Sequence, residues 1–409
     1  MKTLVLAAVL LGFAPGEGQG TATHTGTWQA RLNEKWQAAS TTSERRVHLQ
    51  LQHEDRGQWG TSVRLSELEG LGTPDPRWSG KDVRFTLKRS AGTVQFQGDF
   101  VNGLGAGTFE FTPNAQFVKQ MSARFGTIEG RDLFRLAILD VSEEFIAQIE
   151  REGYKGLDLD DLTRMRIHGV DAEYIRGLRS AGYDKLSVED LVRTRIHGAT
   201  PQYVKAMSDA GYTGMSIEEL VRTRIHGATP AFVQEMKAAG VSNLDVDGLV
   251  RMRIHGVTPA FIKEMRDLGF KDLRIEELVQ LRIHGTTPAY VRELRDLGFK
   301  DMTVRDITQM RIHGVSTEFI KELRSLGYQD LDAGDLVKMK IHGVTPEFIR
   351  EMKELGYGNL SREKLVQFRI HGVNAQFVRE VRDAGYKDLS ADELVEFSIH
   401  GRRWLKRRG

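Results

Sequence analysis

The chain of 409 residues contains no cysteine, which excludes disulfide bonds, thiolate metal sites, a cysteine nucleophile and a lipidated N-terminal cysteine. It also lacks an excess of one charge, because 58 Lys and Arg stand against 56 Asp and Glu and leave a formal net charge of +2. No overall field therefore draws it to nucleic acid or to an anionic membrane. No apolar run reaches the roughly 20 residues that span a bilayer. Stability must come from packing, and any binding charge must be local.

Signatures of catalysis are missing as well. The sequence has no H-E-x-x-H, no G-x-S-x-G and no complete phosphate-binding motif around Gly80-Lys81. The glycine-rich segment from Gly103 to Gly107 is flanked by expected strands and is not followed by a helix, which favours a hairpin turn over a phosphate-binding loop. We therefore predict a protein that is not an enzyme and that uses neither a cofactor nor a metal.

The first residues resemble a secretory signal. Lys2 precedes the apolar run Leu4–Phe13, and small residues follow up to about Gly20–Ala22. A buried first strand or helix is disfavoured, because Pro15 and the glycines after it would end that element at once. We expect residues 1–21 to be a cleaved signal peptide and the mature protein to be periplasmic or secreted.

Residues 22–112 show the period-two alternation of a small antiparallel β domain with about six strands. The alternating apolar positions are Val47, Leu49, Leu51, Val63, Leu65, Val83, Phe85, Leu87, Val94, Phe96, Phe109 and Phe111. Four of the five tryptophans (Trp28, Trp36, Trp59 and Trp78) lie in this region. They either line a ligand cavity inside the domain or form its core and edge cover, and the second role is the more common one.

The rest of the chain is an internal repeat. The tripeptide Ile-His-Gly recurs every 29 residues, with its histidine at 168, 197, 226, 255, 284, 313, 342, 371 and 400. Nine full units fill residues 138–398, a degenerate capping repeat covers 113–137, and a truncated repeat with a basic tail covers 399–409.

Each unit carries the signals of two short helices. In the unit that starts at Ile254, Thr258 is placed to cap a helix, Pro259 suits its first position and Gly269 is placed to end it with φ > 0. A second helix opens at the capping box Ser216–Glu219 and runs to Ile225, which we expect to be structural. Helices of about ten residues are too short to be stable alone, so the units must stack. The predicted fold is mainly α: an α-solenoid of two-helix repeats after an antiparallel β domain.

The nine aligned histidines suggest a metal site, but neighbouring helices pack about 10 Å apart and a metal needs its ligands about 2 Å away. A histidine at the end of a helix instead suits the helix dipole. Because histidine titrates near pH 6.5, a pH-sensing ladder remains an alternative hypothesis.

A basic residue precedes each of the first eight Ile-His-Gly tripeptides, and these eight form our candidate partner-binding site. They are Arg166, Arg195, Arg224, Arg253, Arg282, Arg311, Lys340 and Arg369. The alternative is that these eight residues form an ordinary solvent-exposed face of the array and bind no partner. Variable helix-one positions (Ala206, Glu235, Glu264 and Glu293) are expected to add specificity. On this hypothesis Arg253→Glu impairs binding but not folding, whereas Gly269→Val impairs folding.

Two resemblances bear on function. The segment Ile341–Met352, followed by Leu-Gly-Tyr at 355–357, resembles repeats appended to bacterial β-lactam-sensor-type antirepressor membrane peptidases, and the β domain resembles segments that accompany those repeats. The resemblance implies an envelope or signalling setting, without peptidase activity, because the membrane region and the H-E-x-x-H motif are absent. Gly256-Val257-Thr258 also resembles the hairpin of helix-hairpin-helix DNA-binding modules, with threonine in place of the second glycine.

We therefore expect an exported, non-enzymatic scaffold that binds a protein, a peptide or an envelope polymer. The alternative is sequence-independent phosphate or nucleic-acid binding through the hairpins.

Overall fold

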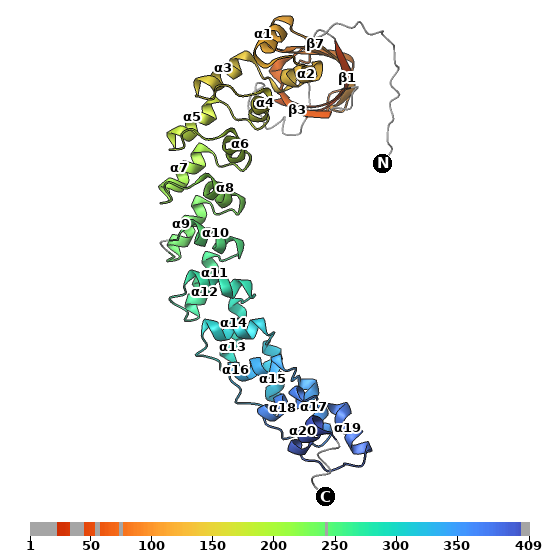
Figure 1. Ribbon diagram of the computed structural model, residues 1–409, viewed down its shortest axis with the longest axis vertical. Coiled ribbons are helices and arrows are strands. Elements are labelled where there is room, and N and C mark those ends of the chain that lie inside the picture. Colours follow the sequence, from red (N-terminus) through yellow and green to blue (C-terminus); the bar gives the residue numbers. More distant parts are fainter. Residues whose placement is uncertain (1–22, 33–44, 54–57, 73–76, 242–243, 402–409) are drawn as a thin grey trace. The chain divides into compact units, whose positions relative to one another are not determined.

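The computed structural model describes residues 23–53, except 33–44, and residues 58–401, except 73–76 and 242–243 (Figure 1). The expected signal peptide (1–21), Trp36 and the basic tail from residue 402 lie outside the described residues. The chain divides into two compact units, residues 1–209 with 213–221 and residues 210–212 with 222–409. The predicted fold class is confirmed, since a mainly helical array follows an antiparallel sheet.

The first unit opens with a seven-stranded antiparallel sheet of half-barrel form, in the order β3-β2-β1-β7-β6-β5-β4. Its strands are β1 (His24–Leu32), β2 (Arg46–His53), β3 (Gln58–Arg64), β4 (Leu68–Glu69), β5 (Gly80–Arg89), β6 (Gly92–Val101) and β7 (Leu104–Pro113). Among the described residues this is one strand more than expected, because β4 is too short to show alternation in the sequence.

The concave face of the sheet is filled by aromatic side chains. Trp28 is 1% exposed and packs edge-on against Phe85 at 5.2 Å between ring centroids. Helix α2 (Gly130–Leu139) contacts β1, β6 and β7 (Figure 1), and its Phe134 stacks on Phe109 at 5.0 Å. Trp59 contacts Phe134 as well, at 5.5 Å. Trp28 therefore belongs to the core, and the half-buried Trp59 covers its edge.

The glycine-rich segment forms a two-residue hairpin turn between β6 and β7, as the flanking strands predicted. Asn102 and Gly103 make the turn with φ of 50° and 77°. Gly105 instead lies inside β7, where a β-carbon would come within 2.7 Å of the Trp28 ring. Its role is to let the aromatic core approach the strand.

The described residues after Asn114 form a series of helices joined by short connections. The first unit contains α1 (Ala115–Phe125), α2, α3 (Glu143–Arg151), α4 (Leu159–Ile167), α5 (Ala172–Ser180), α6 (Val188–Ile196) and α7 (Pro201–Asp209). Next comes α8 (Ile217–Ile225). The second unit contains α9 (Pro230–Ala238), α10 (Val246–Ile254), α11 (Pro259–Asp267), α12 (Ile275–Ile283), α13 (Pro288–Asp296), α14 (Val304–Ile312), α15 (Thr317–Ser325), α16 (Ala333–Ile341), α17 (Pro346–Glu354), α18 (Arg362–Ile370), α19 (Ala375–Asp383) and α20 (Ala391–His400).

The predicted start and stop signals are confirmed. The backbone N–H of Phe261 donates to Oγ1 of Thr258 at 3.1 Å, and Pro259 is the first residue of α11. The N–H of Gly269 (φ 92°) donates to the carbonyl of Arg266 at 2.8 Å. Ser216 and Glu219 form the expected reciprocal capping box. These local bonds fix helix lengths of mostly nine residues, with a turn between them.

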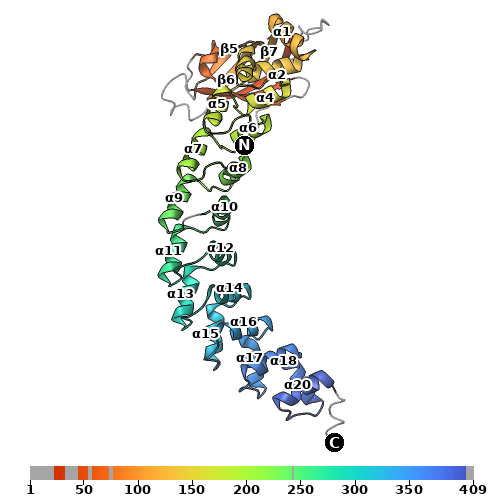
Figure 2. The ribbon, with the colours of Figure 1, turned by 60° about the vertical axis from the view of Figure 1, so that its left-hand side comes forward.

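Within the second unit the helices form two layers, drawn side by side in Figure 2. Even-numbered helices pack on even-numbered ones, as α10 does on α12 and α12 on α14, and odd-numbered helices do the same. Phe261, Ile262 and Met265 of α11 are at most 6% exposed and face the core between the layers. Equivalent residues of consecutive repeats therefore lie next to each other. No helix in the described part of the chain is both long and apolar enough to cross a membrane.

Candidate functional site

The isoleucine of every Ile-His-Gly tripeptide is exposed, which corrects the expectation that it is structural. Relative exposure runs from 46% to 55% over Ile167, Ile196, Ile225, Ile254, Ile283, Ile312, Ile341, Ile370 and Ile399. The reason is helical geometry: at 3.6 residues per turn, Ile254 lies about 140° around α10 from the buried Leu249. The repeat therefore presents one half-exposed aliphatic side chain to solvent at the C-terminal end of each second helix.

The eight basic residues of the candidate partner-binding site form a row beside these isoleucines. Most of them also contact an aromatic ring of the preceding repeat. Arg253 lies about 40° around the axis of α10 from the buried Leu249, and therefore on the side of the helix that faces the core. Its guanidinium carbon lies 5.0 Å from the ring centroid of Phe232, 21 residues earlier. The same stacking recurs for Arg166 on Phe145, Arg195 on Tyr174, Arg282 on Phe261, Arg311 on Tyr290, Lys340 on Phe319 and Arg369 on Phe348. Arg224, at the end of α8, is exposed, as are Arg195, Arg253 and Arg369.

Each stacked guanidinium also reaches the end of the preceding second helix. A β-carbon on Gly256 would lie 3.3 Å from Nη2 of Arg282, and one on Gly343 would lie 3.1 Å from Nη2 of Arg369. Nε of Arg311 donates to the carbonyl of His284 at 3.3 Å. Since Gly256 follows Ile254 by two residues, the guanidinium of Arg282 lies between the helix ends that carry Ile254 and Ile283. The surface therefore alternates between an aliphatic side chain and a cation.

Acidic partners of these cations are few among the residues that the structure describes. Arg166 pairs with Asp140 at 2.6 Å. For Arg253, Arg282, Arg311, Lys340 and Arg369, the described residues provide no ion pair. The helix dipole stabilises a positive charge at the C-terminal end of a helix, but it does not neutralise that charge. The row of basic residues therefore keeps a net positive charge. We call the five pairs from Arg253-Ile254 to Arg369-Ile370 the Ile–Arg surface.

The histidines follow the isoleucines, and those after α4, α6, α10, α12, α14, α16 and α18 are the C-cap residues of these helices, whereas His400 is the last residue of α20. The backbone N–H of His255 donates to the carbonyl of Arg251 at 3.1 Å, and Gly256 after it has φ of 66°. Six of the nine rings are half-buried, and those of His197, His226 and His400 are exposed. Nowhere in the described ranges do three or more potential ligands gather as a metal site.

The variable positions of the first helices lie in the other layer. Glu235, Glu264 and Glu293 are exposed, and Ala206 is half-buried. Glu264 lies 3.8 Å from Nη2 of Arg292 in the next repeat. These residues do not join the Ile–Arg surface, because they project from the odd-numbered helices.

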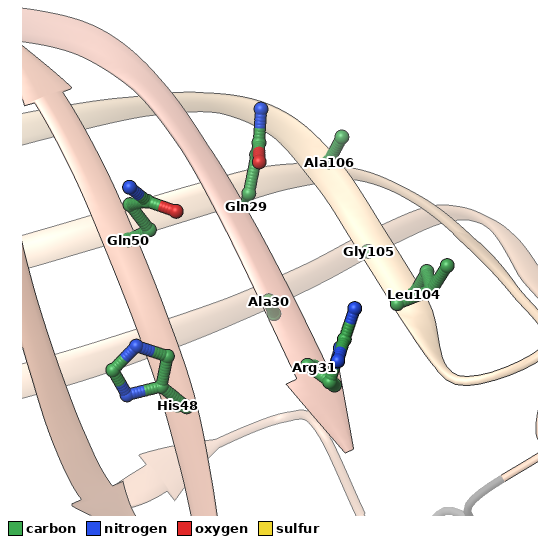
Figure 3. A pocket seen from close by; sticks show the side chains of 8 residues that line it. All are labelled: Gln29, Ala30, Arg31, His48, Gln50, Leu104, Gly105 and Ala106. Atoms are coloured by element: carbon green, nitrogen blue, oxygen red, sulfur yellow. The ribbon is translucent and has the colours of Figure 1, made fainter. Parts of the chain in front are cut away.

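A groove of about 740 Å³ lies on the outward face of the sheet (Figure 3). Gln29 and Gln50 project into it from paired positions of β1 and β2, and Arg31 and His48 form the next outward pair. Leu104 closes one side from β7. The residues that line the groove offer hydrogen-bond donors, and none of them is acidic.

A chain of ion pairs links the sheet to the first repeat inside the first unit. Arg89, 13% exposed, lies 3.1 Å from Glu67 and 3.6 Å from Asp140, which also binds Arg166. Burial raises the pKa of Glu67, but hydrogen bonds from Arg64 and Arg89 outweigh it and lower the pKa to about 2. The β domain and the first repeat therefore share one electrostatic network.

No family model matches the chain, and no curated protein matches it significantly.

Proposed function

We propose that the protein is an exported, non-enzymatic scaffold that binds another protein through the Ile–Arg surface. One observation carries the proposal: an aliphatic side chain is half-exposed at the same place in nine consecutive repeats. Single exposed apolar residues are ordinary, whereas apolar residues repeated in register on packed helices are typical of an interaction surface.

The energetics support a protein partner. Covering apolar surface contributes about 25 cal/mol per Å², so several isoleucines covered together supply a useful binding free energy. The stacked guanidiniums add specificity, since the aromatic rings and the helix ends that they contact hold them in place before a partner binds. The resemblance of residues 341–357 to repeats of antirepressor membrane peptidases and the signal-like residues 1–21 support an envelope setting. Phosphate binding uses the cations alone and leaves the isoleucines unexplained.

The test is affinity capture from envelope extract with three forms of the mature full-length protein. These are the native form, the surface variant Ile254→Ser/Ile283→Ser/Ile312→Ser, and the control Lys263→Ser/Arg292→Ser/Lys321→Ser, whose residues are exposed on the first helices. We expect a stoichiometric protein to be retained by the native and control forms and lost from the surface variant. Equal capture by all three forms contradicts the proposal, and retention of nucleic acid alone, eluted by salt, favours the phosphate-binding alternative.

A further inference from the structure

The spacing of the Ile–Arg surface restricts what can cover it. In the second unit, α10 packs on α12, α12 on α14, α14 on α16 and α16 on α18. Packed helices lie about 8–10 Å apart, so equivalent isoleucines recur at about that interval. A partner must offer apolar side chains at the same interval and on a single face.

An α-helix laid along the row meets this requirement. Seven residues are about two turns and rise about 10.5 Å, so apolar residues at i, i+7 and i+14 stay on one face and in step with the isoleucines. An extended strand advances about 10 Å in three residues, but its side chains alternate between faces, so every second contact would be lost.

The cations restrict the partner further. The guanidinium of Arg282 lies against Gly256, between the ends of α10 and α12, and Arg369 lies against Gly343 in the same way. A docked helix therefore meets a cation about 5 Å, or three to four residues, after each isoleucine. Among the described residues, no acidic side chain pairs with Arg253, Arg282, Arg311 or Arg369. Acidic side chains of the docked helix, three or four residues after each apolar one, would form ion pairs with these arginines.

We propose that the partner of the Ile–Arg surface is an acidic amphipathic helix, with an aliphatic residue at every seventh position and Glu or Asp three or four residues after it. The proposal deepens the scaffold function and rests on it. Five repeats from Ile254 to Ile370 accept about 28 helical residues, since four intervals of about 10 Å equal the length of such a helix.

The test uses a synthetic, labelled 28-residue peptide of four heptads, with Leu at the first position, Glu at the fourth, and Ala and Gln elsewhere. Two matched peptides change one property each: the first has Lys in place of Glu, and the second has the same composition with Leu and Glu repeating every six residues. Binding to the full-length protein is followed by fluorescence anisotropy and peptide helicity by circular dichroism.

We expect the heptad peptide to bind and to gain helicity, and we expect added salt to weaken this binding. The peptide with Lys and the peptide with the six-residue repeat should each bind at least tenfold more weakly. Ile254→Ser/Ile283→Ser/Ile312→Ser should weaken binding at least tenfold, while Lys263→Ser/Arg292→Ser/Lys321→Ser should leave it unchanged. A variant with Arg253→Gln, Arg282→Gln and Arg311→Gln should reduce the preference for Glu over Lys.

Equal binding of the Glu and Lys peptides, equal binding of the two spacings, or no binding overturns the proposal. Binding to vesicles of equal phosphatidylglycerol and phosphatidylcholine, without peptide binding, also overturns it and indicates a lipid surface. The scaffold function is judged separately, because capture of a partner that is not an acidic helix would uphold that function and refute only this inference.

Discussion

Lys185 has a φ of 56°, in the left-handed region that non-glycine residues rarely adopt. Glycine occupies the equivalent positions one repeat before and after, where Gly156 and Gly214 have φ of 73° and 66°. The left-handed conformation costs a non-glycine residue roughly 1–2 kcal/mol, which a glycine would not pay. Part of this gain is offset because glycine loses more conformational entropy when the chain folds. We predict that Lys185→Gly raises the free energy of unfolding by about 1 kcal/mol, measured by urea denaturation.

Lys155 provides the matched control, since it precedes Gly156 and its own φ is negative. Lys155→Gly should not stabilise the protein, because there glycine only adds entropy to the unfolded chain. If both substitutions destabilise equally, the backbone strain assigned to Lys185 is wrong.

The pKa of Glu67 gives a pH-dependent prediction. Because its folded pKa of about 2 lies below the ordinary value of 4.5, the ionised group stabilises the fold above pH 4.5, and this contribution disappears as the pH falls towards 2. Because the side chain of Arg64 is 55% exposed, solvent screens its ion pair, and the shift corresponds to about 1–3 kcal/mol. Glu67→Gln should therefore lower the free energy of unfolding by up to that amount at pH 7, with a difference that shrinks below pH 4.5 in denaturant titrations. A difference that stays constant down to pH 2 contradicts the ion-pair account.

At the scale of the helix, the stacked cations act in folding as well as in binding. The sequence alone suggested that Arg253→Glu affects binding only, but Arg253 stacks on Phe232 and lies against Gly227 of the preceding repeat. Loss of a cation–π contact is worth about 0.5–1 kcal/mol, and a carboxylate at a helix C-terminus adds repulsion. We predict that Arg253→Glu lowers the free energy of unfolding by about 1–2 kcal/mol.

Ile254→Ser, one residue on, should change the free energy of unfolding by less than about 0.5 kcal/mol, because the side chain is half-exposed. The two variants, compared by thermal melting, separate the part of the surface that supports the fold from the part left for a partner. A large loss of stability for Ile254→Ser would show that the isoleucine is buried after all.

The same contrast shows what the sequence could predict. Local signals such as Thr258, Pro259 and Gly269 predicted the helix ends, because a cap or a left-handed glycine acts within a few residues. The exposure of Ile254 was missed although helical geometry carried the signal: the position lies five residues after buried Leu249. The stacking of Arg253 on Phe232 and the packing of Phe134 into the half-barrel depend on tertiary contacts between distant residues, which no local pattern encodes.

At the scale of the molecule, stability and binding should both be sums over repeats. Removal of residues 256–284 joins His255 to Gly285 and deletes one 29-residue period in phase. We predict that the shortened protein folds with unchanged helical content per residue and binds the 28-residue heptad peptide more weakly, because one isoleucine and one cation are lost from the row. Circular dichroism and anisotropy test this, and complete loss of folding would contradict additive repeats.

The central claim, that the isoleucine row is a free binding surface, is tested most directly by methyl NMR of the full-length protein labelled at isoleucine. Titration with the heptad peptide should shift the methyl resonances of Ile254, Ile283, Ile312 and Ile341 together, while those of buried Ile262, Ile320 and Ile349 stay in place. A soluble paramagnetic agent should attenuate the first group before the peptide is added and attenuate it less afterwards. Equal attenuation of both groups, or peptide-induced shifts confined to the buried group, would contradict the account.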